Sequence, residues 1–308
     1  MREATIEMTD GFLIHAIVMK PEGNPLGHIH LLHGMAEHIG RYEEFAQYLV
    51  GKGYIVSGHD HRGHGKTAKM NGIKGHFADE GGFDHVVQDA FEVISNLREQ
   101  YPSPRFVLFG HSMGSFVARR YVQLHGSEVD LAILSGTGGN PGVSRLAGQV
   151  VAYLNGKKNG FDQPDNFLNK LVFGGFNKSV HQPKTPFDWL STDMEAVEKY
   201  LIDPQCGAVS TTQFFADLFK GLGDIHDIDE INKIPKKLPI FLFSGSEDPV
   251  GDNGKGVWSV AKQYNNAGIE DVTVFLFEGG RHEMLHEKNR QHVFETVYDW
   301  IEKNEELS

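Results

Sequence analysis

Short apolar runs alternate with longer amphipathic segments along most of this chain, and that alternation restricts the possible folds more than any other feature. Three of the runs are HIHLLHG (28–34), RFVLFG (105–110) and LPIFLFSG (238–245). Other segments have apolar residues at helical spacing, such as FDHVVQDAFEVISNLREQYP (83–102). Continuous apolar strands are typical of a parallel sheet covered by helices on both faces. We therefore predict an α/β fold built on a doubly wound sheet.

One long segment interrupts the alternation. From residue 138 to about residue 220 the sequence is irregular and rich in aromatic residues, and the alternating pattern resumes beyond it. We predict one core made of residues 1–137 and 221–308, with a cap or lid inserted at 138–220. The start of the chain adds a hairpin, because apolar residues alternate on both sides of a turn at Asp10–Gly11.

Charge and composition limit the partners that the chain can have. The net charge is −12, and the densest basic stretch is the short KIPKK at 233–237, so we expect no nucleic-acid partner. The single cysteine, Cys206, allows no intrachain disulfide and indicates a reducing compartment. The first residues lack the features of a signal peptide, and no apolar run approaches the roughly 18 residues of a membrane span. We expect a cytoplasmic protein that makes at most transient contact with lipid aggregates or a membrane surface.

The segment Gly110-His111-Ser112-Met113-Gly114 follows an apolar run directly and opens a helical segment. A nucleophile on a sharp turn from strand to helix needs a strained backbone and neighbours without side chains two residues away on each side. Gly110 and Gly114 meet that need, and the amino end of the following helix directs free N–H groups toward Ser112. Ser112 is therefore the predicted nucleophile. The alternative is a plain turn whose serine caps the helix.

A serine hydroxyl needs a base, and the base needs an orienting carboxylate. In enzymes whose serine stands on such a strand-to-helix turn, the acid and then the base follow the serine in the chain, after later strands of the sheet. SEDPV offers Glu247 and Asp248 after one apolar run, and His282 follows the next. We favour Asp248 because its Asp-Pro step places it at the turn of the loop, and Glu247 remains the alternative.

Negative charge that develops on a substrate oxygen requires preorganised N–H donors. The amide of Met113, directly after the nucleophile, is the first candidate. The second is expected from the loop after an earlier strand, where HLLHGMAEH (30–38) stands, and we favour the amide of Met35. Glu37 and His38 either hydrogen-bond near this loop or cap it, and the sequence does not decide between these interpretations.

The chain resembles the α/β-hydrolase superfamily and, within it, the monoglyceride lipase and lysophospholipase group of serine hydrolases. The likeness rests on HGMAEHIGRY (33–42), GHDHRGHG (58–65), GHSMGS (110–115) and the pair GSEDPV and GGRHEMLH. PFDWLSTD and IDPQCG are similar to the cap segment of that group. The resemblance implies an eight-stranded, mostly parallel sheet flanked by helices, with an antiparallel second strand and an inserted, mainly helical cap.

The same resemblance implies the roles of individual residues. Ser112, Asp248 and His282 match the catalytic set of the group, and Met35 and Met113 match its oxyanion hole. It implies no metal and no organic cofactor. The chain departs from the pattern at residue 115, where a serine stands in place of a second glycine found in many members.

His59, His61 and His64 are spaced H-x-H-x-x-H, a pattern that resembles the metal motif of β-lactamase-like metallohydrolases. That motif also needs an aspartate directly before the last histidine, where this chain has Gly63. The stretch instead resembles the D-x-R-G-H-G loop of the hydrolase group, in which Asp60 and its neighbouring arginine are expected to make structural contacts. We therefore predict that these histidines shape a loop and bind no metal.

The predicted function is hydrolysis of a small-molecule acyl ester through an acyl-enzyme intermediate. The apolar residues of the insert favour a lipid-like substrate, a monoacylglycerol or lysophospholipid, and Phe173 and Trp189 are candidates for contact with it. Three alternatives with the same fold remain open: a small-ester esterase, an amidase and an acyltransferase. A fourth is a non-catalytic relative that binds lipid.

Overall fold

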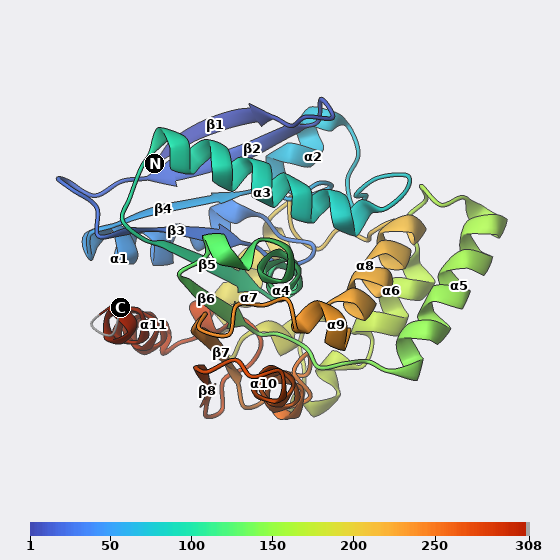
Figure 1. The fold of residues 1–308 in the computed structure, drawn as a ribbon. Coiled ribbons are helices and arrows are strands. Elements are labelled where there is room, and N and C mark those ends of the chain that lie inside the picture. The colour runs from blue at the N-terminus through green and yellow to red at the C-terminus, as the bar shows by residue number, and fades with distance from the viewer. Residues whose placement is uncertain (306–308) are drawn as a thin grey trace.

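A computed structural model describes residues 1–305 of the chain, and within that range eight strands form one sheet (Figure 1). Their order across the sheet is β1-β2-β4-β3-β5-β6-β7-β8. The strands are β1 (Arg2–Glu7), β2 (Leu13–Met19), β3 (Gly27–Leu32), β4 (Tyr54–His59), β5 (Phe106–His111), β6 (Leu131–Ser135), β7 (Ile240–Gly245) and β8 (Val272–Phe277). β2 runs antiparallel to both of its neighbours, and all other neighbouring strands are parallel. The predicted eight-stranded, mostly parallel sheet is confirmed.

Helices cover both faces of the sheet, which explains why its central strands β3 to β7 are buried along their whole length. Along β5, Phe106 and Leu108 belong to one buried cluster, and Val107 and Phe109 belong to another on the opposite face. The first cluster includes side chains of α3, α4 and α10, and the second includes side chains of α1 and α11. These helices are α1 (Glu43–Gly51), α3 (Gly82–Gln100), α4 (Met113–His125), α10 (Lys255–Asn266) and α11 (Arg290–Glu305).

A short helix, α2 (Gly65–Asn71), was not expected from the sequence, because only Thr67 and Ala68 of its residues are buried and they make no helical pattern. It follows the histidine-rich loop and packs near β2. Its Thr67 hydroxyl accepts a hydrogen bond from the backbone N–H of His15, at 2.9 Å, and donates one to the carbonyl of Asp60, at 2.8 Å. These bonds fix the end of β4 against β2.

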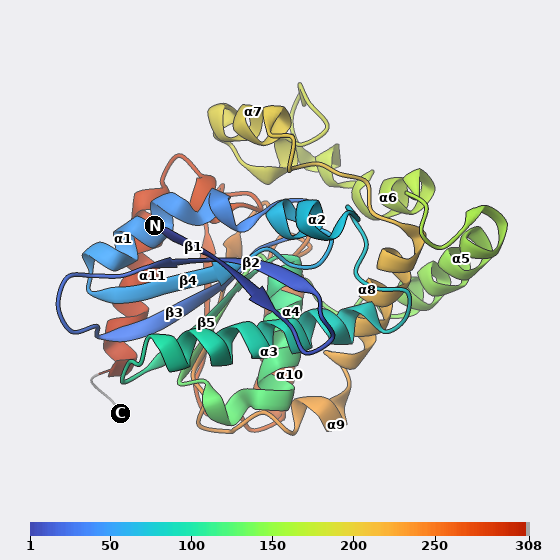
Figure 2. The same cartoon turned by 90° about the horizontal axis from the view of Figure 1, so that it is seen from above.

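The segment between β6 and β7 is largely helical. Its helices are α5 (Val143–Asn159), α6 (Asn166–Phe173), α7 (Met194–Ile202), α8 (Thr212–Asp224) and α9 (Ile228–Ile231). α5, α6 and α8 lie together beside the core, and α7 lies apart from them (Figure 2). Ala152, Leu168 and Phe214 from this segment share the buried cluster that contains α3 and α4. The division of the chain into a core and a cap at 138–220 stays a prediction, and α8 runs past residue 220.

Candidate active site

Ser112 lies on the turn that joins β5 to α4, and the backbone there is strained. Its φ and ψ are 51° and −120°, a conformation that residues other than glycine rarely adopt. A Cβ atom on Gly110 would lie 2.3 Å from the carbonyl oxygen of Gly114, and one on Gly114 would lie 2.1 Å from that of Leu32. Only glycine fits at both positions, because the contacts are with backbone atoms that cannot move aside. The turn holds the Ser112 side chain at the carboxyl edge of the sheet.

Asp248 and His282 come from the loops that follow β7 and β8, and the structure joins them. His282 Nδ1 is 2.9 Å from Asp248 Oδ1, and both side chains are buried. Two further donors hold the carboxylate: the Ser244 hydroxyl at 2.6 Å and the Val250 amide at 2.9 Å. Glu247, the alternative acid, is exposed to solvent. The geometry therefore favours Asp248 as the partner of His282.

The pKa values of this pair are shifted in opposite directions. Burial alone would lower the pKa of His282 and raise the pKa of Asp248, because it disfavours both charged forms. The opposite charges and the hydrogen bond between the two side chains outweigh burial, so the pKa of His282 lies above its ordinary value and that of Asp248 below it. The site therefore stabilises a protonated His282, the form that would follow proton transfer from a serine hydroxyl.

Ser112 and His282 line one cavity, together with Met35 and aromatic side chains of the insert. Among the latter, Phe173 and Trp189 lie with their ring planes 25° apart and their centroids 6.1 Å apart. The Trp189 ring is also 5.1 Å from the ring of His282. The structure thus brings both predicted substrate-contacting residues to the predicted nucleophile and base.

The predicted oxyanion-hole residues lie on either side of the nucleophile. Met113 is the first residue of α4, and the first amides of a helix have no partner within that helix. Met35 belongs to the loop after β3, which passes close to Ser112: a Cβ atom on Gly34 would lie 3.2 Å from the Ser112 Cβ. The structure therefore places the two residues near the nucleophile, and their amides as oxyanion donors remain a prediction.

A buried ionic network braces that loop, and most of it was missed in the sequence. Glu37 Oε1 accepts hydrogen bonds from the Gly34 amide at 2.6 Å and the Tyr42 hydroxyl at 2.9 Å. Arg41 donates to Glu37 at 2.5 Å and makes two bonds to Glu283, at 2.6 and 2.7 Å. Glu283 follows His282 directly, so Arg41 connects the loop of Met35 to the loop of the histidine. The i, i+4 spacing of Glu37 and Arg41 was the available sequence signal.

The histidines of the H-x-H-x-x-H pattern are buried, and two of them hydrogen-bond to different partners. His59 Nδ1 is 2.9 Å from His30 Nε2, and His64 Nδ1 is 2.8 Å from the carbonyl of Arg62. In the same stretch, the Asp60 carboxylate accepts hydrogen bonds from the backbone amides of Ile39 and Lys66, each at 2.8 Å. Hydrogen bonds therefore hold this loop in place.

The arginine of this loop, Arg62, makes two bonds to the buried Asp89, at 2.5 and 2.8 Å. This pair joins the loop to α3. Asp60 and Arg62 thus make the kind of structural contacts expected of them.

Comparison with known proteins agrees with this architecture. Residues 23–289 match the model of the Hydrolase_4 family, which is described as serine aminopeptidase, S33. The chain belongs to this family of α/β hydrolases. It is 28% identical to a monoacylglycerol lipase of Mycolicibacterium smegmatis over 92% of this chain and 91% of that protein. It is 27% identical to human monoglyceride lipase over 95% of this chain and 88% of that protein.

A solved structure gives a similar result. A thermostable carboxyl esterase from Bacillus coagulans, in complex with glycerol, superposes with a TM-score of 0.91 at 29% identity, covering 98% of each chain. Together these relatives identify the chain as a serine hydrolase of the monoglyceride lipase and esterase group.

Proposed function

We propose that this hydrolase cleaves lipid-like carboxylic esters, with Ser112 as nucleophile, His282 as base and Asp248 as the orienting acid. The observation that carries the proposal is the shared cavity: Ser112 and the His282–Asp248 pair meet under Phe173 and Trp189 of the insert. Acyl transfer from a hydrophobic ester requires a nucleophile, a base and an apolar wall. The serine on its strained turn, the buried histidine and the aromatic side chains are the candidates for these parts.

The reaction proceeds in two steps. Ser112 Oγ attacks the ester carbonyl carbon while His282 Nε2 takes the serine proton, and Asp248 stabilises the imidazolium that forms. The amides of Met35 and Met113 bind the oxyanion. The C–O bond then breaks, and the alcohol leaves with the proton from His282. In the second step a water molecule gives a proton to His282 and attacks the acyl-serine, which releases the fatty acid and restores Ser112.

The surface of the insert also supports a lipid substrate. An outer apolar stripe runs along α5 and onto α6, and its side chains are more than half exposed. It consists of Val143, Leu146, Val150, Tyr153, Leu154, Phe167 and Leu171. On α5 the spacing of these residues puts them on one face of the helix. No helix within residues 1–305 is long and apolar enough to cross a bilayer, so we propose that the stripe rests on lipid aggregates without spanning them.

The first test compares kcat/KM across acyl esters from acetyl to palmitoyl, with monoacylglycerol and lysophosphatidylcholine alongside. We expect kcat/KM to rise with chain length by up to about fourfold per methylene, because each buried methylene contributes about 0.8 kcal/mol. A small-ester esterase is the second candidate, favoured by the likeness to the Bacillus coagulans esterase. A maximum at short chains, with both lipids inert, would establish that candidate instead.

The outer apolar stripe can be tested separately from the cavity. In the double variant Val150→Gln and Leu154→Gln, we expect kcat/KM on vesicle-bound monoacylglycerol to fall about tenfold, because less apolar surface is buried at the lipid. Hydrolysis of a soluble short-chain ester should not change. The matched control is Ile228→Gln with Trp258→Gln, whose side chains are similarly exposed, at 54 and 55%, but lie outside the stripe. Equal losses in both double variants would rule out a specific lipid-contacting face.

A further inference from the structure

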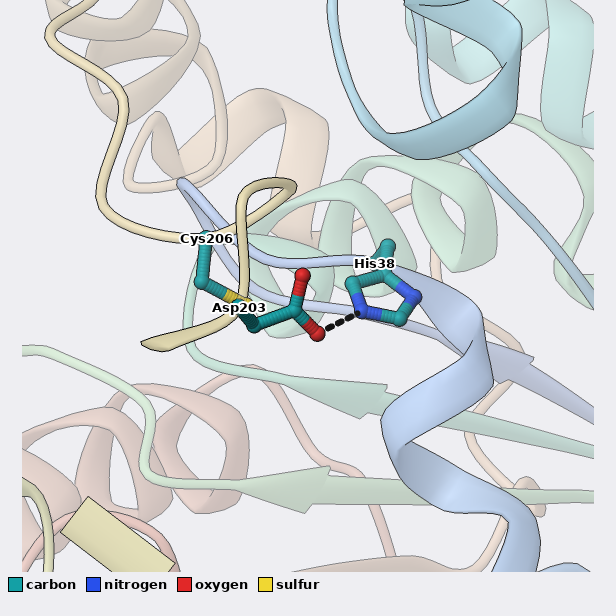
Figure 3. A group of neighbouring side chains, drawn as sticks. All are labelled: His38, Asp203 and Cys206. Carbon is teal, nitrogen blue, oxygen red and sulfur yellow. Dashed lines mark hydrogen bonds and ion pairs between the residues drawn. The ribbon is translucent and has the colours of Figure 1, made fainter. Parts of the chain in front are cut away.

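Three side chains suited to metal binding meet at the seam between the loop of Met35 and the end of α7: His38, Asp203 and Cys206 (Figure 3). Their ligand atoms all lie within 4.8 Å of one another. His38 Nε2 is 2.9 Å from Asp203 Oδ2. No sequence motif links these side chains, because 165 residues separate the histidine from the aspartate.

The backbone around the three side chains already holds two of them in position. The Asp203 carboxylate accepts a hydrogen bond from the Gln205 amide through Oδ1, at 2.8 Å, which leaves Oδ2 facing His38. The Cys206 amide donates to the carbonyl of Asp203 at 3.0 Å and closes the turn that carries both side chains. Such supporting bonds orient the ligands in natural metal sites.

The charges around the seam favour a cation. Glu37, Glu283 and Asp203 bring three carboxylates to this region, against the positive charges of Arg41 and of Lys74, which donates to the Pro204 carbonyl at 2.7 Å. Arg41 donates hydrogen bonds of 2.5 to 2.7 Å to the two glutamates. Asp203 is left with His38 as its side-chain partner, at 2.9 Å.

A second group of possible ligands, Glu37, His111 and Glu283, lies close by but does not make a comparable site. The guanidinium of Arg41 already occupies the position between its two carboxylates. At the first group the side chains of His38 and Asp203 are 13 and 27% exposed, so an ion can reach it from solvent.

We propose that His38, Asp203 and Cys206 bind one zinc ion, with a fourth position left for water. Zinc accepts imidazole nitrogen, carboxylate oxygen and thiolate sulfur, whereas magnesium and calcium select oxygen alone. Binding releases the thiol proton of Cys206 and moves the ring proton of His38 from Nε2 to Nδ1. Two hydrogen bonds are given up: the 2.9 Å bond between His38 Nε2 and Asp203 Oδ2, which the two bonds to zinc replace, and the longer one, 3.2 Å, that His38 Nδ1 accepts from the Gly40 amide.

Bound zinc would strengthen an existing connection between the core and the insert. Ala36, next to Met35, accepts two hydrogen bonds through its carbonyl: from the Tyr200 hydroxyl at 3.0 Å and from the Gly207 amide at 2.8 Å. The zinc ligands on the insert, Asp203 and Cys206, lie between these two donors in the chain. The metal would therefore clamp the segment after α7 onto the predicted oxyanion loop.

Cobalt provides a specific test, since Cys206 is the only cysteine of the chain. Adding Co²⁺ to the reduced, full-length protein is expected to produce a cobalt–thiolate charge-transfer band in the near ultraviolet, which one equivalent of Zn²⁺ abolishes. Calorimetry in buffers of different ionisation enthalpy should count about one proton released per zinc. No charge-transfer band at saturating Co²⁺ would overturn the proposal.

Two variants separate this site from zinc held elsewhere on the surface. We expect Cys206→Ser and Asp203→Asn each to weaken zinc binding at least about tenfold. The matched control is Asp79→Asn, at an exposed carboxylate 3.4 Å from His76, and it should leave the affinity unchanged. Far-ultraviolet circular dichroism establishes that each variant is folded. If Cys206→Ser and Asp203→Asn are both folded and bind zinc with unchanged affinity, the proposed zinc site is refuted.

Discussion

Replacing Ser112 by alanine is expected to lower kcat for ester hydrolysis by about four to six orders of magnitude. The side chain occupies a strained turn whose geometry only Gly110 and Gly114 allow, and it shares its cavity with His282. Alanine fits the same backbone, so the fold should persist while the acyl-enzyme can no longer form. Steady-state kinetics measures the loss, and labelling by a fluorophosphonate should disappear with it.

Two companion variants make that result specific. Ser127→Ala changes an exposed serine outside the site and should keep full activity. Asp248→Asn should lower kcat by about four orders of magnitude, because an amide cannot stabilise the imidazolium of His282 or hold its required tautomer. Normal turnover or normal labelling in the Ser112 variant would show that the nucleophile lies elsewhere.

The free energy of unfolding is expected to fall steeply as the pH drops from about 6.5 to 4. Burial disfavours the charged form of several histidines, which lowers the pKa of His28 and His111 to about 4 and that of His59 to about 3. Once unfolded, the same side chains titrate near pH 6.5. Between these pH values the unfolded chain binds protons that the folded chain does not. The free energy of unfolding therefore rises with pH and reaches its full value only above about pH 6.5.

Each such histidine contributes a slope of up to about 1.4 kcal/mol per pH unit. Urea unfolding at several pH values between 4 and 7.5 measures the sum of these slopes. The variant His61→Leu removes the slope that one buried histidine contributes. His61 suits this test because both of its ring nitrogens are buried without a hydrogen-bond partner in the described part of the chain. In this variant the free energy of unfolding should depend less steeply on pH than in the wild type. His85→Leu, at a side chain 44% exposed, is the control, and a curve parallel to wild type for both variants would contradict the explanation.

The sequence was sufficient to predict most of the sheet, and it also named the three residues of the proposed triad, because both rest on local signals. Apolar runs end in glycine or in polar residues at the carboxyl edge, and there Ser112, Asp248 and His282 stand. α2 was missed because two buried residues make no periodic pattern. The ionic network of Arg41 was missed for another reason: 242 residues separate it from Glu283, and only the fold brings them together.

The H-x-H-x-x-H pattern shows the limit of reading spacing alone. The rings of His59 and His61 lie 4.8 Å apart, yet His59 bonds to His30 on a neighbouring strand and His61 also packs against the ring of His33 at 4.3 Å. Conversely, the three side chains of the proposed zinc site form no sequence motif. Metal-ligand spacing in the chain was therefore a poor guide to which side chains bring their ligand atoms together in the described part of the chain.

The bonds from Arg41 to Glu37 and Glu283 also set the order in which this protein can become active. Residues 37 and 41 are synthesised close together, and residue 283 follows Arg41 only after 242 further residues. A nascent or truncated chain that ends before the loop of His282 contains the serine but lacks both the base and the anchor of the Met35 loop. Under the proposed mechanism, hydrolysis begins only after synthesis has passed His282 and Glu283, and shorter chains cannot attack the lipids around them.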